Sequence, residues 1–417
     1  MKSFVPKVIA LFGVAVLCGG CGTSTESAPP STSAAAPTST TTSPVPEAAE
    51  ATPVLARVVA DPVPVLATDG KVHLAYELEL VNAMGFDVTL TSLTVRSGDR
   101  TLLALKGDEL AYWTRALGAS QTPTTKLGAG QAGIVWLDVA VDPPKDGAPG
   151  VPTELSHTLD VNLSKPMPPL LPATMSEHLA PVAVSTHTPV VISPPLDGPK
   201  WLDGNGCCDM TAHRMAMNPL NGQLWAAERF AIDYLQLSPD GTIFRGDRSK
   251  PESYPYFGAD IHAVADGPVV SVMEGLPEQI AGQAPTGLPL EQYGGNHVVQ
   301  DIGGGNYAFY AHLKTGTVKV KPGDQLTSGQ VIANLGNTGN TDAPHLHFHV
   351  MSTPDPLRSN GLPFVFKSYT LDAELASMDA LDPLLLGKPA PLKPGSTPRD
   401  EANTSPLVLD VMSYARG

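Results

Sequence analysis

Residues 344–350 read Pro-His-Leu-His-Phe-His-Val, and this stretch decides which fold and which chemistry are expected of the chain. Side chains alternate between the two faces of a β-strand, so His345, His347 and His349 share one face and the apolar residues share the other. Two histidines two residues apart can aim both nitrogens at one metal ion, or one at a metal and one at its substrate. The spacing therefore favours a metal-binding or catalytic strand, and an exposed polar face is the alternative.

Glycine-rich and histidine-bearing elements precede this strand at short intervals. In chain order they are Gly-Asn-His-Val-Val at 295–299, Tyr-Ala-His-Leu at 310–313, Gly-Gln-Val-Ile at 329–332 and Leu-Gly-Asn-Thr-Gly at 335–339. Followed by Pro-His-Leu-His-Phe, they resemble the LytM/lysostaphin-type zinc metallopeptidase domain. Members of that family have a small antiparallel β fold and mostly cut the cross-bridges or stem peptides of peptidoglycan. The resemblance covers about residues 205–365.

The resemblance implies a zinc site and assigns roles to particular residues. His347 matches a zinc ligand of the family, and His312 and His345 match the residues beside the metal that polarise the water or stabilise the developing oxyanion. Zinc with three protein ligands keeps its fourth site for water and lowers the pKa of that water to about 7. A neighbouring imidazole titrates near neutrality, so it can accept or return a proton. Zn²⁺ is the cofactor that the resemblance implies.

The family also requires a His and an Asp four residues apart, and here the pattern is broken. Asp233 supplies the carboxylate, but the position four residues earlier is Arg229, whose guanidinium cannot bind zinc. Either His213 reaches the metal from an adjacent strand, or the site binds metal poorly and the domain is a pseudoenzyme. Some exported relatives carry Arg-Phe-Ala-Ile-Asp together with an upstream His, which favours His213 as the third ligand. Arg229 is then expected to orient the substrate.

Plainer alternatives stand beside these assignments. His213 is read otherwise as an ordinary surface histidine, and Asp233 as a carboxylate that caps a turn. The further histidines His262, His297 and His349 are expected to be surface residues or outer neighbours of the site. Residues 237–258 interrupt the family pattern, and we expect this insertion to form a loop that faces the substrate.

Cys207 and Cys208 are adjacent in the sequence. Adjacent cysteines rarely bridge, because their geometry departs from that of an ordinary disulfide. A strained redox pair, a metal site and two small buried residues all remain open, and the last of these is the favoured interpretation.

The part of the chain before the histidine-rich region has the pattern of a different β domain. Residues 55–195 contain short runs with apolar residues at every second position, punctuated by Gly, Asp and Pro. The sequence therefore predicts an all-β protein, with an N-terminal immunoglobulin-like β-sandwich followed by a LytM-type antiparallel β-sheet peptidase domain at 200–370. The sandwich is expected to be a spacer or a wall-binding module. Residues 371–417 are expected to be an extended segment with an edge strand near 407–412.

The N-terminus has the pattern of an export signal. Residues 1–21 have a positively charged start and a short apolar stretch that ends before Cys21, as in a bacterial lipoprotein signal in which that cysteine bears the lipid. A plain cleaved signal peptide is the alternative. Residues 22–54 are rich in Ser, Thr, Ala and Pro and predict a disordered tether. The expected location is the cell envelope, with a lipid anchor in the membrane.

Composition argues against one class of partner. The net charge is −15 and no run of Lys or Arg occurs, so the basic face that phosphate contacts need is not expected, and neither is nucleic acid as a partner. The sequence thus predicts an exported zinc endopeptidase whose partners are peptidoglycan and the membrane. The alternative that Arg229 keeps open is a degenerate LytM-like module that binds the wall and activates a separate cell-wall hydrolase.

Overall fold

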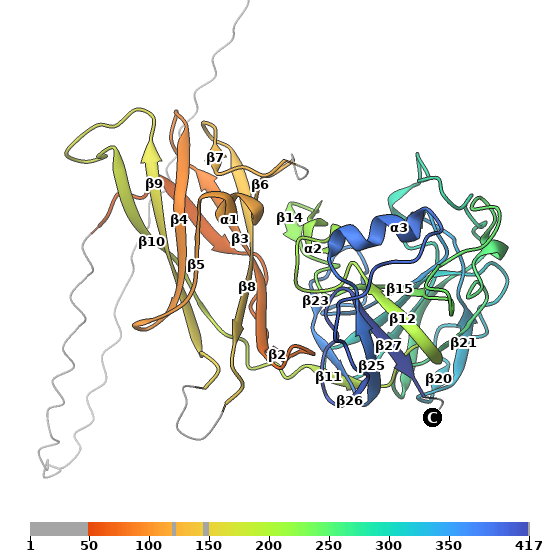
Figure 1. The fold of residues 1–417 in the computed structure, drawn as a ribbon. Coiled ribbons are helices and arrows are strands. Elements are labelled where there is room, and N and C mark those ends of the chain that lie inside the picture. The colour runs from red at the N-terminus through yellow and green to blue at the C-terminus, as the bar shows by residue number, and fades with distance from the viewer. Residues whose placement is uncertain (1–48, 119–121, 145–149, 416–417) are drawn as a thin grey trace, which may run out of the picture. The chain divides into compact units, whose positions relative to one another are not determined.

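The computed structural model describes residues 49–118, 122–144 and 150–415. The expected signal peptide with Cys21 and most of the expected tether lie outside these residues. Residues 51–417 form one compact unit, and its regular structure is mostly antiparallel strands, which confirms the all-β fold (Figure 1). Among the described residues, no helix has the length and apolar character needed to span a membrane.

Two five-stranded antiparallel sheets form the N-terminal part. The first contains β1 (Val54–Val58), β3 (Val72–Asn82), β8 (Ala132–Val141) and β6 (Thr114–Ala116) in that order, with β2 (Val65–Leu66) beside β3. The second contains β10 (Thr174–Ala183), β9 (Glu154–Leu163), β4 (Val88–Ser97) and β5 (Arg100–Lys106), with β7 (Lys126–Leu127) beside β4. Apolar residues at alternate positions of both sheets share one buried core, so the two sheets form a sandwich. Its immunoglobulin-like character stays a prediction.

Strand β3 is buried on both faces, unlike a strand with one solvated side. The even positions from Val72 to Leu80 belong to the sandwich core. The odd positions face the other way, and Ala75 packs against Cys207, Cys208 and Phe230 of the C-terminal part. The sandwich and the C-terminal part therefore share a buried contact on the outer face of β3.

The C-terminal part is built on an 11-stranded sheet whose neighbouring strands are all antiparallel. In order these are β20 (Gln325–Leu326), β17 (Gly267–Met273), β18 (Asn296–Asp301), β19 (Tyr307–Leu313), β22 (Leu346–Met351), β15 (Ile232–Gln236), β12 (Gly198–Gly204), β27 (Asp410–Tyr414), β25 (Tyr369–Glu374) and β26 (Arg399–Glu401), with β23 (Gly361–Leu362) beside β22. The expected edge strand near 407–412 is instead β27, which lies inside the sheet. The sheet therefore extends well past residue 370.

Smaller elements complete the unit. Three two-stranded pairs are β11 (Val190–Ile192) with β24 (Phe364–Phe366), β13 (Asn218–Leu220) with β14 (Gln223–Trp225), and β16 (Asp260–His262) with β21 (Val331–Asn334). The described helices are short: α1 (Gly107–Tyr112), α2 (Ala212–Met215), α3 (Leu381–Leu385), and the 3₁₀ turns η1 (Pro251–Ser253), η2 (Leu290–Gln292) and η3 (Met378–Ala380).

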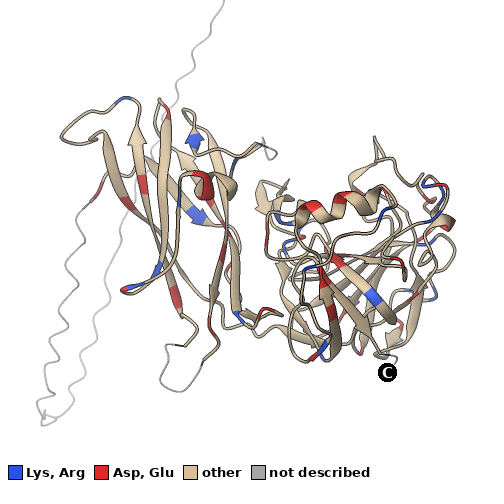
Figure 2. Cartoon of the chain, viewed as in Figure 1, with Lys and Arg blue, Asp and Glu red and all other residues tan. Residues whose placement is uncertain are grey.

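Charged residues are spread over strands and loops, with both signs intermixed (Figure 2). The exceptions that matter for the site are fully buried. Glu77, Arg214 and Arg229 each expose 2% of their surface or less. A buried charge destabilises the folded state unless it is paired, so these three charged residues are expected to interact with one another.

Candidate active site

The register of three neighbouring strands sets the site. β22 lies between β15 and β19, with Asp233 of β15 and Ala311 of β19 directly opposite His347. Opposite residues of antiparallel strands point to the same face of the sheet, so Asp233 and His347 project together. They line a cleft of about 970 Å³ that His213, His312 and His345 also line.

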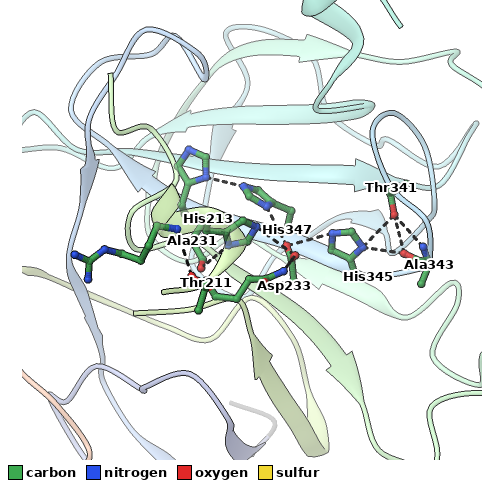
Figure 3. Close-up of polar contacts among 11 residues, drawn as sticks. Thr211, His213, Ala231, Asp233, Thr341, Ala343, His345 and His347 are labelled. Atoms are coloured by element: carbon green, nitrogen blue, oxygen red, sulfur yellow. Dashed lines mark hydrogen bonds and ion pairs between the residues drawn. The ribbon is translucent and has the colours of Figure 1, made fainter. Parts of the chain in front are cut away.

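The carboxylate of Asp233 is the centre of this arrangement (Figure 3). Its Oδ1 lies 3.0 Å from Nδ1 of His347 and 3.2 Å from Nε2 of His345. Its Oδ2 lies 3.2 Å from Nε2 of His213 and accepts a hydrogen bond of 2.9 Å from Nδ2 of Asn205. The structure thus brings the expected residues of the first strand and of the histidine strand to one point.

His213 reaches the carboxylate from a helix and not from the paired strand that the sequence suggested. It lies on the one-turn helix α2, whose first turn is capped by the side chain of Thr211. Nδ1 of His213 lies 2.9 Å from the carbonyl oxygen of Ala231 and donates to it in the tautomer that leaves Nε2 toward Asp233. A backbone acceptor of this kind fixes the ring and directs the second nitrogen into the cleft.

His312 and His345 lie side by side, with ring centroids 4.6 Å apart. Nδ1 of His312 is 2.7 Å from the carbonyl oxygen of Thr338, and Nδ1 of His345 is 2.8 Å from that of Ala343. His312 also has a left-handed backbone, with φ of 60°, which is uncommon for a residue with a side chain. Both rings are therefore held through Nδ1, which leaves Nε2 of His345 toward Asp233.

A glycine allows the close backbone approach beside the Thr338 carbonyl, which holds the ring of His312. Gly295 has φ of +61°, and a Cβ at this position would lie 2.2 Å from the carbonyl oxygen of Thr338. Only a residue without a side chain lets the segments 294–296 and 336–339 approach this closely. The Leu-Gly-Asn-Thr-Gly motif thus serves to place the Thr338 carbonyl against His312.

The three extra histidines take different places. His349 is buried, with Nδ1 2.9 Å from Nε2 of His347, and among the described residues its own Nε2 has no hydrogen-bond partner. His297 lines the cleft with Nδ1 held by the carbonyl of Gly295. His262 pairs with Asp197 and does not line the cleft.

The charges of the site act strongly on its own groups. Burial raises the pKa of Asp233, yet His213 and His345 together hold it well below its usual range. Burial lowers the pKa of His213, and Asp233 overcomes this to give a pKa of about 9. Burial, with His345 and His347, holds the pKa of His312 well below the ordinary value. Asp233 is therefore ionised and His312 neutral at neutral pH.

The donor set fits a zinc ion. The ligand atoms of His213, Asp233 and His347 all lie within 4.8 Å of one another, and so do those of His312, His345 and His347. Nitrogen and carboxylate oxygen are the donors that zinc takes in catalytic sites. Rings anchored through one nitrogen, with the other aimed at a common point, are typical of such sites.

The cleft walls include residues that the sequence did not indicate. One wall is the segment 284–294 between β17 and β18, and another is 354–358 after β22. A signal existed in the first wall, because Leu290 and Tyr293 are large apolar side chains that are 46% and 42% exposed.

The insertion at 237–258 was expected in this position, and that interpretation is wrong. None of its residues lines the cleft. Instead Ile243, Phe244, Tyr254 and Tyr256 are buried in the core of the C-terminal part. The insertion therefore builds core and not a substrate-facing loop.

Arg229 also lies elsewhere than expected. It does not line the cleft, and its guanidinium is 3.2 Å from Oε2 of Glu77 on sandwich strand β3. It donates a further hydrogen bond of 2.6 Å to the carbonyl of Ala75. The expectation that Arg229 orients substrate is thus corrected, because the side chain is used to bind the sandwich.

Cys207 and Cys208 are buried, as the favoured interpretation had it, but they also form a disulfide with each other, which that interpretation did not include. The pair is buried against Ala75 and Phe230. A third candidate group of metal donors contains Cys208 with His73 and Asp138. Since the Cys208 sulfur is already bonded, it is not available there as a thiolate.

A peptidase domain is what the fold and the histidine-carboxylate site define, and the comparisons with known proteins agree. Residues 254–359 match the model of Peptidase family M23. The match includes His312, His345 and His347 and begins after Asp233. Residues 254–359 therefore match a LytM-type peptidase domain of family M23. This family is zinc-dependent, in agreement with the donor set.

Individual relatives cover limited parts of the chain. The glycyl-glycine endopeptidase ALE-1 of Staphylococcus capitis is 34% identical over 96 residues, which are 23% of this chain and 22% of that protein. The chain thus spans about a fifth of this relative. The catalytic domain of lysostaphin from Staphylococcus simulans is 20% identical, with 39% of this chain and 88% of that chain covered and a TM-score of 0.22. A zinc-containing peptidase from Vibrio cholerae is 16% identical, with 69% and 80% covered and a TM-score of 0.20.

Proposed function

We propose that the protein is a zinc-dependent endopeptidase that hydrolyses peptide bonds of peptidoglycan. The observation that carries the proposal is the Asp233 carboxylate, which three imidazoles approach within 3.2 Å in a cleft. The family match and the similarity to a glycyl-glycine endopeptidase support peptide cleavage in the cell wall as the reaction.

His213, Asp233 and His347 would hold the zinc ion. When bound, zinc polarises a carbonyl oxygen and lowers the pKa of a coordinated water to about 7. The chain itself supplies the rigidity of the donors. Asn205 fixes one oxygen of Asp233, and the carbonyl of Ala231 fixes the ring of His213.

His312 and His345 are the residues that we assign to the proton and the oxyanion. Their Nδ1 atoms are held by backbone carbonyls and both rings line the cleft, with Nε2 of His345 beside the Asp233 carboxylate. One of these two imidazoles would accept a proton from the attacking water and return one to the leaving amine. The second imidazole donates a hydrogen bond to the negative charge that develops on the carbonyl oxygen.

The place of action follows from the N-terminal sequence. We propose export, attachment to the membrane through a lipid on Cys21, and a tether at 22–54 that carries the domains into the cell envelope. This arrangement would keep the cleft near its polymeric substrate.

The experiment compares purified wild-type protein with His347→Ala and His262→Ala on isolated muropeptides. Wild type and His262→Ala are expected to hold one zinc per chain and to release cleaved peptides, because His262 lies outside the cleft. His347→Ala is expected to lose both. Full cleavage by His347→Ala would overturn the assignment. A wild-type protein that takes up no zinc would instead indicate a degenerate module that binds the wall.

A further inference from the structure

We propose that the N-terminal sandwich is part of the metal site, and that Glu77 on strand β3 positions His213 and Asp233. Glu77 acts through two arginines: Arg214 directly follows His213 in the sequence, and Arg229 lies four residues before Asp233. The proposal rests on the proposed function only in taking His213 and Asp233 as zinc ligands.

Glu77 lies between the two arginines in an interior without solvent access. Its exposed fraction is 0%. Oε2 accepts a hydrogen bond of 3.2 Å from Nη1 of Arg229, and Oε1 lies 3.8 Å from Nε of Arg214, an ion-pair distance. In an interior of low dielectric constant, one carboxylate between two guanidinium groups is held by strong electrostatic attraction.

The guanidinium group of each arginine also donates hydrogen bonds to backbone carbonyls of the sandwich. Arg229 donates to the carbonyls of Ala75 at 2.6 Å, Ala60 at 3.4 Å and Asp61 at 3.4 Å. Arg214 donates to the carbonyl of Leu137 on β8 at 3.3 Å. The guanidinium groups are thus fixed by the frame of the sandwich in addition to the carboxylate of Glu77.

Both arginines lie on the segments that carry the ligands His213 and Asp233. Arg214 follows His213 on α2, a helix of only four residues, so a displacement of its side chain moves the histidine as well. Arg229 lies two residues before Ala231, whose carbonyl holds Nδ1 of His213, and three before β15, on which Asp233 lies 3.2 Å from Nε2 of His213. His213 therefore depends on a segment that is anchored in the sandwich, whereas Asp233 is also held by the pairing of β15 with β12 and β22.

Apolar side chains surround the contact between Arg229 and the sandwich. Phe230 is buried with Ala75, Cys207 and Cys208, and the Arg229 guanidinium lies 5.0 Å from the centre of the Phe230 ring. Water is excluded from this contact, so the arginines have no solvent to replace Glu77 if its charge is removed.

This connection also accounts for the broken family motif. The position where the family carries a ligand is occupied here by Arg229, whose side chain points to the sandwich. The imidazole in contact with Asp233 comes instead from α2, next to the second arginine. A role limited to holding the domains together would leave zinc affinity unaffected by Glu77, and this difference is open to measurement.

The experiment measures zinc affinity by chelator competition and the visible d–d spectrum of the Co²⁺-substituted protein. Glu77→Gln removes the charge with little change in shape. The matched control is Glu177→Gln, because Glu177 is also buried in the sandwich but bonds the backbone of Val54 in the sandwich itself. Glu77→Gln is expected to bind zinc about 10–100-fold more weakly, the usual effect of an outer positioning residue, with an altered Co²⁺ spectrum. Glu177→Gln should match wild type.

The outcomes separate this proposal from the proposed function. Wild-type zinc affinity and an unchanged Co²⁺ spectrum in folded Glu77→Gln would overturn the positioning role while leaving the peptidase assignment intact. A wild type without zinc overturns the ligand assignment and this proposal with it. If Glu77→Gln does not fold, Glu77→Asp keeps the charge but shortens its reach. Glu77→Asp is then expected to show an intermediate loss of affinity, and wild-type affinity would contradict the proposal.

Discussion

Strand β22 carries His347 between two strands of its own sheet, whereas residues 212–236, the α2–β15 arm, carry His213 and Asp233 beside arginines that bond the sandwich. The first half of the site is held by regular strand pairing inside one domain. In the second half, Asp233 also lies on a strand paired on both sides, but His213 lies on a short helix next to buried charges that belong to two domains.

The difference teaches which half is rigid by itself. Backbone ladders on both sides of β22 fix His347 regardless of the sandwich. The arm has β12 as a further neighbour of β15, but α2 has no ladder, and its position depends on Thr211, on Ala231 and on the arginines. Substitutions in the two halves should therefore impair the protein in different ways.

The largest effect is expected at the residue where the halves meet. Asp233→Ala removes the carboxylate that faces His213, His345 and His347, and it should abolish zinc binding and reduce cleavage by more than the about 10–100-fold typical of outer residues. Zinc per chain and the rate of muropeptide cleavage are the measurements. Retention of stoichiometric zinc by Asp233→Ala would show that the halves do not share a ligand there.

The next effect concerns the stability of the arm. Arg229→Met leaves the carboxylate of Glu77 buried with a lost partner, so the free energy of unfolding should fall by about 3–5 kcal/mol. Arg245→Met breaks an exposed ion pair with Asp240 and should change the free energy of unfolding far less than Arg229→Met does. Urea unfolding followed by fluorescence compares the two. Equal effects would mean that the interdomain pair contributes no more than a surface pair.

A smaller effect is expected on the histidine-strand side. Thr341→Val removes the hydroxyl that lies 3.2 Å from Nδ1 of His345 and bonds the Ala343 carbonyl. Since the Ala343 carbonyl still holds the ring, cleavage should slow by about tenfold or less, with zinc content unchanged. Thr370→Val on β25 is the control, because its hydroxyl bonds Asp400 outside the cleft. Loss of zinc in Thr341→Val would contradict the separation of ligands from proton-handling residues.

The smallest effect concerns the control glutamate in the sandwich core. Burial raises the pKa of Glu177 from 4.5 to about 7. The folded state then holds a proton that the unfolded state has released, so this residue costs stability as pH rises from about 4.5 through 7. Glu177→Gln should remove this part of the pH dependence, so the stability of the variant should fall less than that of wild type as pH rises through this range. Parallel stability curves of wild type and variant between pH 5 and 8 would contradict it.

The parts of the site that depend on a local sequence pattern could be predicted. The alternation of residues 345–349 predicted a strand with its histidines on one face, and the Tyr-Ala-His-Leu motif indicated His312. The all-β fold followed from period-two runs for the same reason. Each of these features is encoded within a few residues of itself.

Features that depend on distant partners could not be predicted. The partner of Arg229 is Glu77, 152 positions away, and no local period connects them. The place of β27 inside the sheet depends on β12 and β25, and the wall at 284–294 depends on how a loop folds over the cleft. Geometry of this kind is set by packing across the whole unit.

The most direct test of the account is the zinc affinity of His213→Ala, measured beside wild type and His187→Ala. His187 bonds Asn306 and does not line the cleft. If His213 supplies the ligand that position 229 lacks, His213→Ala binds zinc at least about 100-fold more weakly than wild type, while His187→Ala equals wild type. Unchanged zinc affinity in His213→Ala would contradict the account.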